Sequence, residues 1–198
     1  TMSQDLDPVA LSGLLMDLMA PDNDRRRRAE ASFSEQAERH PNSLLQGLLV
    51  VLQSDAGPVG VMAAAMLRRA TGKTRQTLFY SCAPVTQVQL KAGILRALCS
   101  ERPPAVGRLL AACVAGLGGL QCEGEWEELL PALVQSAGAA ETPPAVRAHV
   151  ISALAQLVPY VSEATLNPFL DPIRSVVQAA LACHDHPHLQ GGAVEILS

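Results

Sequence analysis

A short turn that contains proline recurs along the 198-residue chain and divides it into segments with helical periodicity. In most copies an acidic residue is followed by proline and then by an aliphatic residue. The copies lie at residues 21–24, 55–59, 101–106, 141–146 and 185–189. Proline is tolerated in the first turn of a helix, where its missing N–H would have no partner, and a nearby acidic residue complements the helix dipole. Each turn therefore predicts the start of a helix.

Between these turns, apolar residues recur with the i, i+3, i+4, i+7 spacing that places them on one face of a helix. Examples are Leu11, Leu14, Leu15, Leu18; Leu45, Leu48, Leu49, Leu52; Val59, Met62, Ala63, Met66; Val106, Leu109, Leu110, Cys113; Trp126, Leu129, Leu130, Leu133; and Leu166, Phe169, Leu170, Ile173. A helix with one apolar stripe must bury it against a neighbour. The composition agrees, because Ala (30) and Leu (29) favour helices, whereas the 3% content of aromatic residues disfavours a β-sandwich or barrel.

These patterns predict five helix pairs. The first helices are expected at about 6–20, 41–54, 84–100, 124–138 and 165–184, and the second at about 23–40, 57–72, 103–119, 143–160 and from 187 onward. Two helices per roughly 40 residues are typical of HEAT repeats. We therefore predict an all-α fold, an α-α superhelix (solenoid) of about five HEAT repeats at 6–40, 41–72, 84–119, 124–160 and 165–198.

Two features qualify this repeat pattern. The segment 71–83 is longer than the other connections, and we expect it to be a partly ordered loop. The fifth pair stops at Ser198 within a helix. Because a solenoid needs a polar cap on its last repeat, we expect residues 1–198 to be a single solenoid that forms the N-terminal fragment of a longer chain.

Bulk properties argue against several classes of protein. Apolar runs such as residues 47–52 are too short to span a bilayer, and the acidic N-terminus does not resemble a signal peptide. Five scattered cysteines fit a reduced cytosolic or nuclear protein. A net charge of −4 disfavours direct nucleic-acid binding. Gly72-Lys-Thr74 lacks the upstream glycine of a phosphate-binding loop, and no catalytic motif is present, so we predict neither an enzyme nor a bound cofactor.

Three clusters invite a functional interpretation, and in each case we favour a structural one. The run 25–28 consists of four arginines but is flanked by acidic residues, so it fits the first turn of a second helix. The run 183–188 contains a cysteine and three histidines that suit zinc, yet it falls on a recurring turn and has no partner cluster, so no metal site is expected. Glu123, Glu125, Glu127 and Glu128 surround Trp126; they could steer a basic partner, but they also fit the charge of a helix start beside a core tryptophan.

Several segments in order resemble the importin-β (karyopherin-β) family of nuclear transport receptors, and most of all its importin-5/importin-4 branch, also called importin-β-3. Residues 14–30 are similar to the family's opening leucine-rich helix, Pro-Asp-Asn turn and Arg-x-x-Ala-Glu motif. Residues 62–69 (Met-Ala-Ala-Ala-Met-Leu-Arg-Arg) and the Trp126 segment 123–131 resemble motifs of that branch, and residues 90–95 also fit. The segment 70–83 departs from the family pattern.

The resemblance implies a function for the inner surface of the solenoid. In this family, N-terminal repeats bind Ran in its GTP form, and Ran-GTP and basic cargo displace each other. Phe-Gly nucleoporins are expected in the outer grooves between first helices, and the receptor shuttles between cytoplasm and nucleus. On a helical wheel, the inner-surface residues expected to contact a partner are Arg28, Glu35, Glu38, Arg68, Arg108 and Ser152. The small residues on the same surface, which leave room for the partner, are Ala31, Gly60, Ala64, Ala112, Ala115 and Ala148.

One alternative remains open from the sequence. HEAT repeats also build generic scaffolds, such as phosphatase scaffold subunits and vesicle-coat adaptors. The repeat pattern alone does not distinguish these from a transport receptor.

Overall fold

A computed structural model describes residues 7–55, 57–72, 77–121, 124–183 and 187–197. All regular secondary structure within these ranges is helical, which confirms the predicted all-α class. The chain divides into two compact units, unit 1 up to Ile94 and unit 2 from Leu95.

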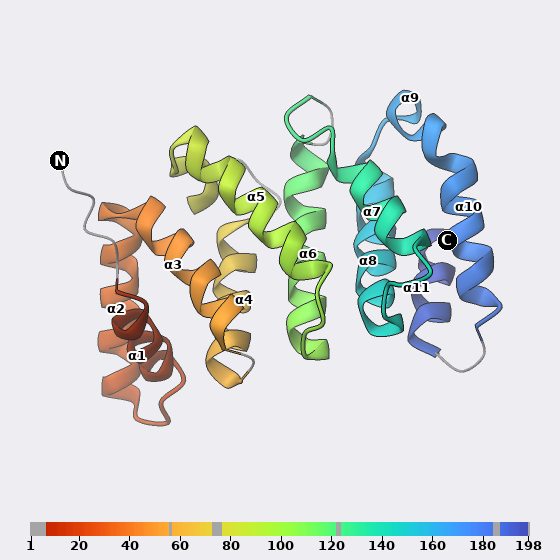
Figure 1. Ribbon diagram of the computed structural model, residues 1–198. Coiled ribbons are helices and arrows are strands. Elements are labelled where there is room, and N and C mark those ends of the chain that lie inside the picture. The colour runs from red at the N-terminus through yellow and green to blue at the C-terminus, as the bar shows by residue number, and fades with distance from the viewer. Residues whose placement is uncertain (1–6, 56, 73–76, 122–123, 184–186, 198) are drawn as a thin grey trace. The chain divides into compact units, whose positions relative to one another are not determined.

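Unit 1 consists of two helix pairs followed by a short connection and the start of a further helix (Figure 1). Its elements are α1 (Pro8–Leu18), α2 (Asn23–Arg39), α3 (Pro41–Ser54), α4 (Pro58–Ala70), the 3-10 helix η1 (Leu78–Ser81) and most of α5 (Pro84–Leu98). Helix α1 packs against α2, α3 and α4, while α3 packs against α2 and α4. The core between them is mainly leucine: Leu11, Leu15, Leu44, Leu45, Leu48, Leu52 and Leu67 are fully buried.

Unit 2 is organised around α8. Its elements are α6 (Pro104–Gln121), α7 (Leu129–Gly138), α8 (Pro144–Leu157), η2 (Val158–Tyr160), α9 (Glu163–Leu166), η3 (Asn167–Phe169), α10 (Leu170–Leu181) and α11 (Pro187–Leu197). Helix α8 packs against α6, α7 and α11, and α10 covers α7 and α11. Half of the residues of α8 are buried as a result, on more than one face. Figure 1 shows α6 and α8 side by side, with α7 running obliquely across α8.

The helices lie close to their predicted positions, and proline explains most of the differences. The helix expected at 124–138 begins only at Leu129, after a turn in which Gly124 has φ of +100°, a conformation that favours glycine. The helix expected at 165–184 is divided into α9, η3 and α10, with Pro168 in η3. Helix α8 likewise ends at Leu157, and Pro159 lies in the 3-10 turn that follows, because proline cannot donate the hydrogen bond that would continue a helix.

The described part of the connection between the second and third pairs contains the 3-10 helix η1. Phe79 of η1 is fully buried, and its ring meets that of Tyr80 edge-on at 5.2 Å between centroids. The buried Thr71 hydroxyl donates to the carbonyl of Leu67 at 2.9 Å, which closes the end of α4. Residues 73–76 lie outside the described residues.

Among the described residues, one helix is long and apolar enough to be tested as a membrane span. Helix α6 has 18 residues, a mean hydropathy of 1.2, and 61% of its residues buried within the protein. Its length of about 27 Å is slightly less than the hydrocarbon thickness of a bilayer. The sequence interpretation did not single out this helix. Its burial against α8 is typical of the core helix of a folded unit.

The contact of α6 with α8 depends on a glycine. Gly107 lies against the imidazole of His149, so that a β-carbon at residue 107 would overlap the ring. We expect Gly107→Ala to lower the free energy of unfolding by up to about 2 kcal/mol, because displacing the ring from a packed contact costs about 1–3 kcal/mol and the helix preference of alanine offsets at most about 1 kcal/mol.

The matched control is Gly13→Ala in α1, where a β-carbon would meet nothing within 4 Å. Alanine is favoured over glycine in a helix by up to about 1 kcal/mol, so this variant should be neutral or stabilised. Urea unfolding followed by circular dichroism compares the two. Equal stability of both variants would contradict the close contact of Gly107.

Candidate protein-binding surfaces

Helix α2 differs from the other long helices because almost all of it is polar. Ala29 is its only buried residue. The Asp22 side chain accepts hydrogen bonds from the backbone N–H groups of Asp24 and Arg25, at 2.8 and 3.1 Å, and thereby caps the helix. Arg25 donates through Nε to Asp17 of α1 at 2.7 Å, and Arg28 donates to the carbonyl of Asp24 at 3.3 Å. These bonds fit the interpretation of the arginine run as the first turn of a helix.

The Asp22 cap makes α2 sensitive to acid. The backbone N–H of Arg25, followed by that of Asp24, holds the pKa of the Asp22 carboxyl below its ordinary value. A lowered pKa in the folded state means that the cap stabilises the protein above the unfolded-state pKa and that this contribution is lost as the pH falls through the folded-state pKa.

We therefore expect Asp22→Asn to lose less stability than the unchanged chain when the pH is lowered from about 5 to below 4, since asparagine caps a helix without titrating. Thermal unfolding across this pH range measures the difference. As a control, Asp171→Asn removes an exposed carboxylate that pairs with Arg174 within α10 and does not cap α2. Parallel pH curves for the Asp22 variant and the unchanged chain would contradict the role of the cap.

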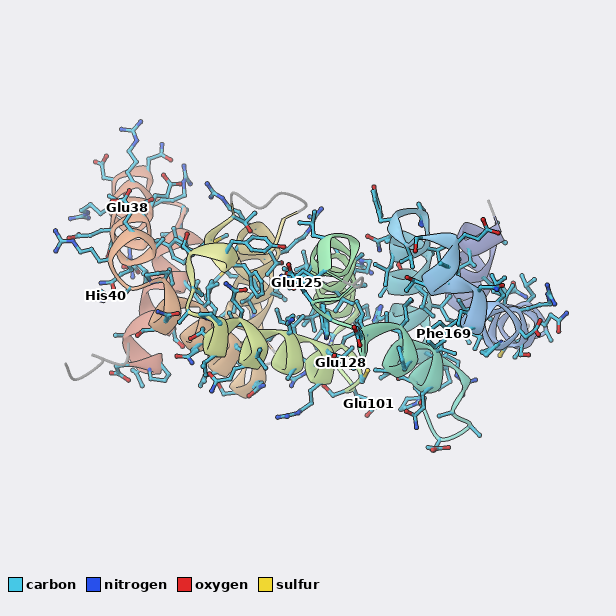
Figure 2. All side chains as sticks on the ribbon, turned by 90° about the horizontal axis from the view of Figure 1, so that it is seen from above. Glu38, His40, Glu101, Glu125, Glu128 and Phe169 are labelled. Carbon is cyan, nitrogen blue, oxygen red and sulfur yellow. The ribbon has the colours of Figure 1, made fainter. Side chains whose placement is uncertain are left out.

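The inner-surface residues predicted in unit 1 are all exposed. Arg28, Glu35 and Glu38 lie along one face of α2, and Arg68 lies on α4. Glu35 also forms an ion pair with Arg39 at 3.3 Å, one turn further along the helix. Figure 2 shows Glu38 among charged side chains that extend away from α2. A partner would thus meet a row of charges on α2 and a separate cation on α4.

The two predicted residues of unit 2 differ in accessibility. Arg108 of α6 is exposed, whereas Ser152 of α8 is half-buried. The Ser152 hydroxyl accepts a hydrogen bond from Nε2 of Gln156 at 3.2 Å. Its backbone nitrogen lies 3.6 Å from the position of a β-carbon on Gly192 of α11.

The small residues expected on the same surface are partly misplaced. Gly60, Ala64 and Ala115 are buried, so that part of the prediction is wrong. Ala112 and Ala148 are half-buried. The physical reason is that these second helices contact neighbours on more than one side, which makes their buried arc wider than one stripe. On α4 the stripe is also rotated, because Met62 and Met66, predicted to be core, are half-exposed.

A groove on unit 1 was missed by the sequence interpretation. We call it the α2–α4 groove: its walls are α2 and α4, and its volume is about 800 Å³. Apolar side chains from α1, α2, α4 and η1 line it, namely Leu18, Phe33, Met62, Met66 and Leu78. The relevant sequence signal was the set Glu30, Phe33, Ser34, Ala37, which has helical spacing but mixed polarity. A set of mixed polarity on one helix does not predict a groove by itself, because the groove also requires a second helix opposite it.

Helices α3 and α5 of unit 1 form a second exposed surface, which we call the first-helix face. The Gln46 side chain donates to that of Gln89 at 2.7 Å, and Asn42 accepts from the backbone of Ala83 at 2.8 Å. Beside these bonds, Val50 of α3 and Val85 and Val88 of α5 are exposed by 46, 69 and 60%. This face carries apolar side chains next to amide groups.

The acidic cluster keeps its structural interpretation. Trp126 is 1% exposed and belongs to the core, which confirms its predicted role, while Glu125, Glu127 and Glu128 are exposed. Figure 2 shows Glu125 and Glu128 well apart along the turn before α7. Glu123 lies outside the described residues.

Cysteine and histidine form no metal centre within the described ranges. The motif at 183–188 falls largely outside them. Cys82 and Cys113 are buried, and Cys99 and Cys183 are half-buried, all without disulfides. Burial raises the pKa of the Cys82 thiol to about 11, so this sulfur stays protonated and unreactive at neutral pH.

Comparison with known proteins identifies the fold. No protein-family model and no curated protein sequence matches the chain. Among solved structures, yeast importin-β (Kap95p) matches with a TM-score of 0.80 and 20% identity, over 97% of this chain and 24% of that chain. A second Kap95p structure matches with a TM-score of 0.79 and 22% identity, over 97% of this chain and 24% of that chain. Its description states that Kap95p binding induces the switch loops of RanGDP to adopt the GTP-bound conformation. A crystal structure of importin-β in an ammonium sulfate condition matches with a TM-score of 0.73 and 18% identity, over 95% of this chain and 24% of that chain.

The chain is thus an α-α solenoid of HEAT repeats, as predicted from its sequence. Its fold is that of importin-β, and it spans 24% of the length of the importin-β chains that it matches.

Proposed function

We propose that the chain is a segment of a nuclear transport receptor of the importin-β family, in its importin-5/importin-4 branch. The observation that carries this proposal is the match of 97% of the chain to Kap95p, together with the motifs at 14–30, 62–69 and 123–131 in the same order as in that family. A generic HEAT-repeat scaffold would share the fold but would not be expected to carry these motifs in this order. The ordered motifs on α1, α2, α4 and the start of α7 favour the transport receptor.

In this proposal the second helices bind Ran in its GTP form. One Kap95p structure is described by its effect on the switch loops of Ran, which supports Ran as the partner. The exposed charges of α2, α4 and α6 can make charge-assisted hydrogen bonds to a protein surface. Because basic cargo and Ran-GTP would favour different states of the solenoid, binding of one lowers the affinity for the other. The receptor would shuttle between cytoplasm and nucleus.

The first-helix face suits Phe-Gly nucleoporins. Their phenylalanines are apolar anchors, and their backbones can bond amide side chains such as those of Gln46 and Gln89. Exposed Val50, Val85 and Val88 provide the apolar contact. This surface lies on helices other than α2 and α4, so both partners could bind unit 1 together.

Ran binding is tested directly with immobilised Ran loaded with a non-hydrolysable GTP analogue or with GDP. We expect the chain to bind the GTP form more tightly. Arg68→Glu and Glu35→Arg should each weaken binding about three- to tenfold, because each replaces an attractive contact with a repulsive one. Arg96→Glu changes an exposed charge on the first helix α5 and serves as the control.

The outcomes separate the candidate functions. Equal binding of both nucleotide forms, or no binding, would reject the transport proposal and favour a generic scaffold. Nucleotide-dependent binding that the second-helix variants leave unchanged would instead reject the assigned surface.

The nucleoporin surface has its own test. We expect Val85→Asp combined with Val88→Asp to reduce binding of a Phe-Gly repeat peptide at least about tenfold, since charge replaces apolar contact area. Ran-GTP binding should stay unchanged in the same variant. Isothermal titration calorimetry measures both. Loss of both affinities together would indicate damage to the fold rather than loss of a site.

A further inference from the structure

The α2–α4 groove has two walls that are each a single helical face. Helix α2 contributes residues at i, i+3, i+4 and i+7 from Glu30 to Ala37, and α4 contributes residues at i, i+4, i+7 and i+8 from Met62 to Ala70. Seven or eight residues of helix measure about 11–12 Å, or two turns. The groove is therefore long enough for two turns of a further helix.

The two units differ in whether successive second helices pack directly against each other. In unit 2, α6 packs directly on α8, and α8 packs on α11. In unit 1, α2 packs mainly on α1 and α3, and the space toward α4 remains as the groove. Apolar helical faces pack by ridges into grooves, so a further helix is the element that would suit an open space between the two helical walls α2 and α4.

The chemistry of the groove defines what fits it. Phe33, Met62 and Met66 are half-exposed apolar walls, and methionine adapts its shape to different partners. Glu30 on the α2 side and Arg69 on the α4 side are exposed, and neither side chain forms an ion pair with another described residue. Oγ1 of Thr77 is buried in the groove without a hydrogen-bond partner among the described residues.

We propose that the α2–α4 groove binds an amphipathic helix from a partner protein. Its apolar stripe would contact Phe33, Met62 and Met66. A basic side chain on one flank would lie beside Glu30, and an acidic one on the other flank beside Arg69. Binding of this helix depends neither on the nucleotide state of Ran nor on the residues assigned to Ran. The groove proposal can therefore be tested independently of the transport proposal.

The probe is a synthetic fluorescein-labelled helix of about four turns. It carries leucines at i, i+3, i+4 and i+7, lysines along one flank and glutamates along the other. We expect saturable binding by fluorescence anisotropy. Met66→Glu should weaken it at least about tenfold, because a charge enters the apolar wall. Val9→Glu, which places the same charge at a valine of α1 that is 77% exposed and outside the groove, should leave the affinity unchanged.

Exchange of the two rim charges tests specificity without altering the core. Glu30→Lys and Arg69→Glu should each weaken binding about threefold through repulsion of one flank. The double variant should restore the affinity, because the helix can bind end for end and present each flank to the opposite wall. Non-specific apolar adsorption would respond to neither single change.

Several results would overturn the proposal. These are the absence of saturable binding, an affinity that Met66→Glu leaves unchanged in a variant with a normal thermal melt, and rim variants without effect. A peptide of the same composition with a central proline should bind at least about tenfold more weakly, since proline breaks the helix. Equal binding of that peptide would show that the occupant is extended rather than helical.

Discussion

Every helix in this chain has apolar residues that it cannot bury alone, and the fold follows from how neighbours cover them. Helix α8 is the clearest example, because neighbours cover it on several sides. It is covered by α6, α7 and α11, and Val146, Val150, Leu154 and Leu157 are almost completely buried. Leucine fills the contacts, while glycine and alanine allow close approach, as at Gly107 below the ring of His149.

Helix α2 represents the opposite case. It buries only Ala29, and its contacts with α1 include exposed polar bonds such as that between Arg25 and Asp17. An exposed ion pair of this kind contributes little to stability. Because most of α2 is not buried, its side chains do not have to fit a packed core, whereas those of α8 do. A second helix that is poorly covered can therefore carry the polar residues that a binding surface needs.

The extent to which the sequence predicted the structure depends on the range of the interactions involved. Proline turns and the i, i+3, i+4, i+7 pattern act within one helix, and they located the helices to within a few residues, apart from the breaks near Pro168 and before Leu129. The wheel for α4 was less accurate, because the burial of Ala64 and the exposure of Met66 depend on which neighbours lie on each side. The α2–α4 groove was not predictable for the same reason. It is formed by two faces that are about thirty residues apart in the chain.

The contrast between α2 and α8 also gives a physical reason for the position of the proposed α2–α4 groove in unit 1. A helix covered on several sides already gains the free energy of apolar burial within the chain, so a partner can add little by contacting it. Phe33, Met62 and Met66 are still half-exposed, and a partner that covers them provides burial that the chain itself does not supply. Glu30 and Arg69 add direction to that contact without adding much to its strength, because charges at a rim mainly determine which partner is accepted. The same incomplete packing that makes α2 the least buried long helix of unit 1 thus creates the surface on which recognition can occur.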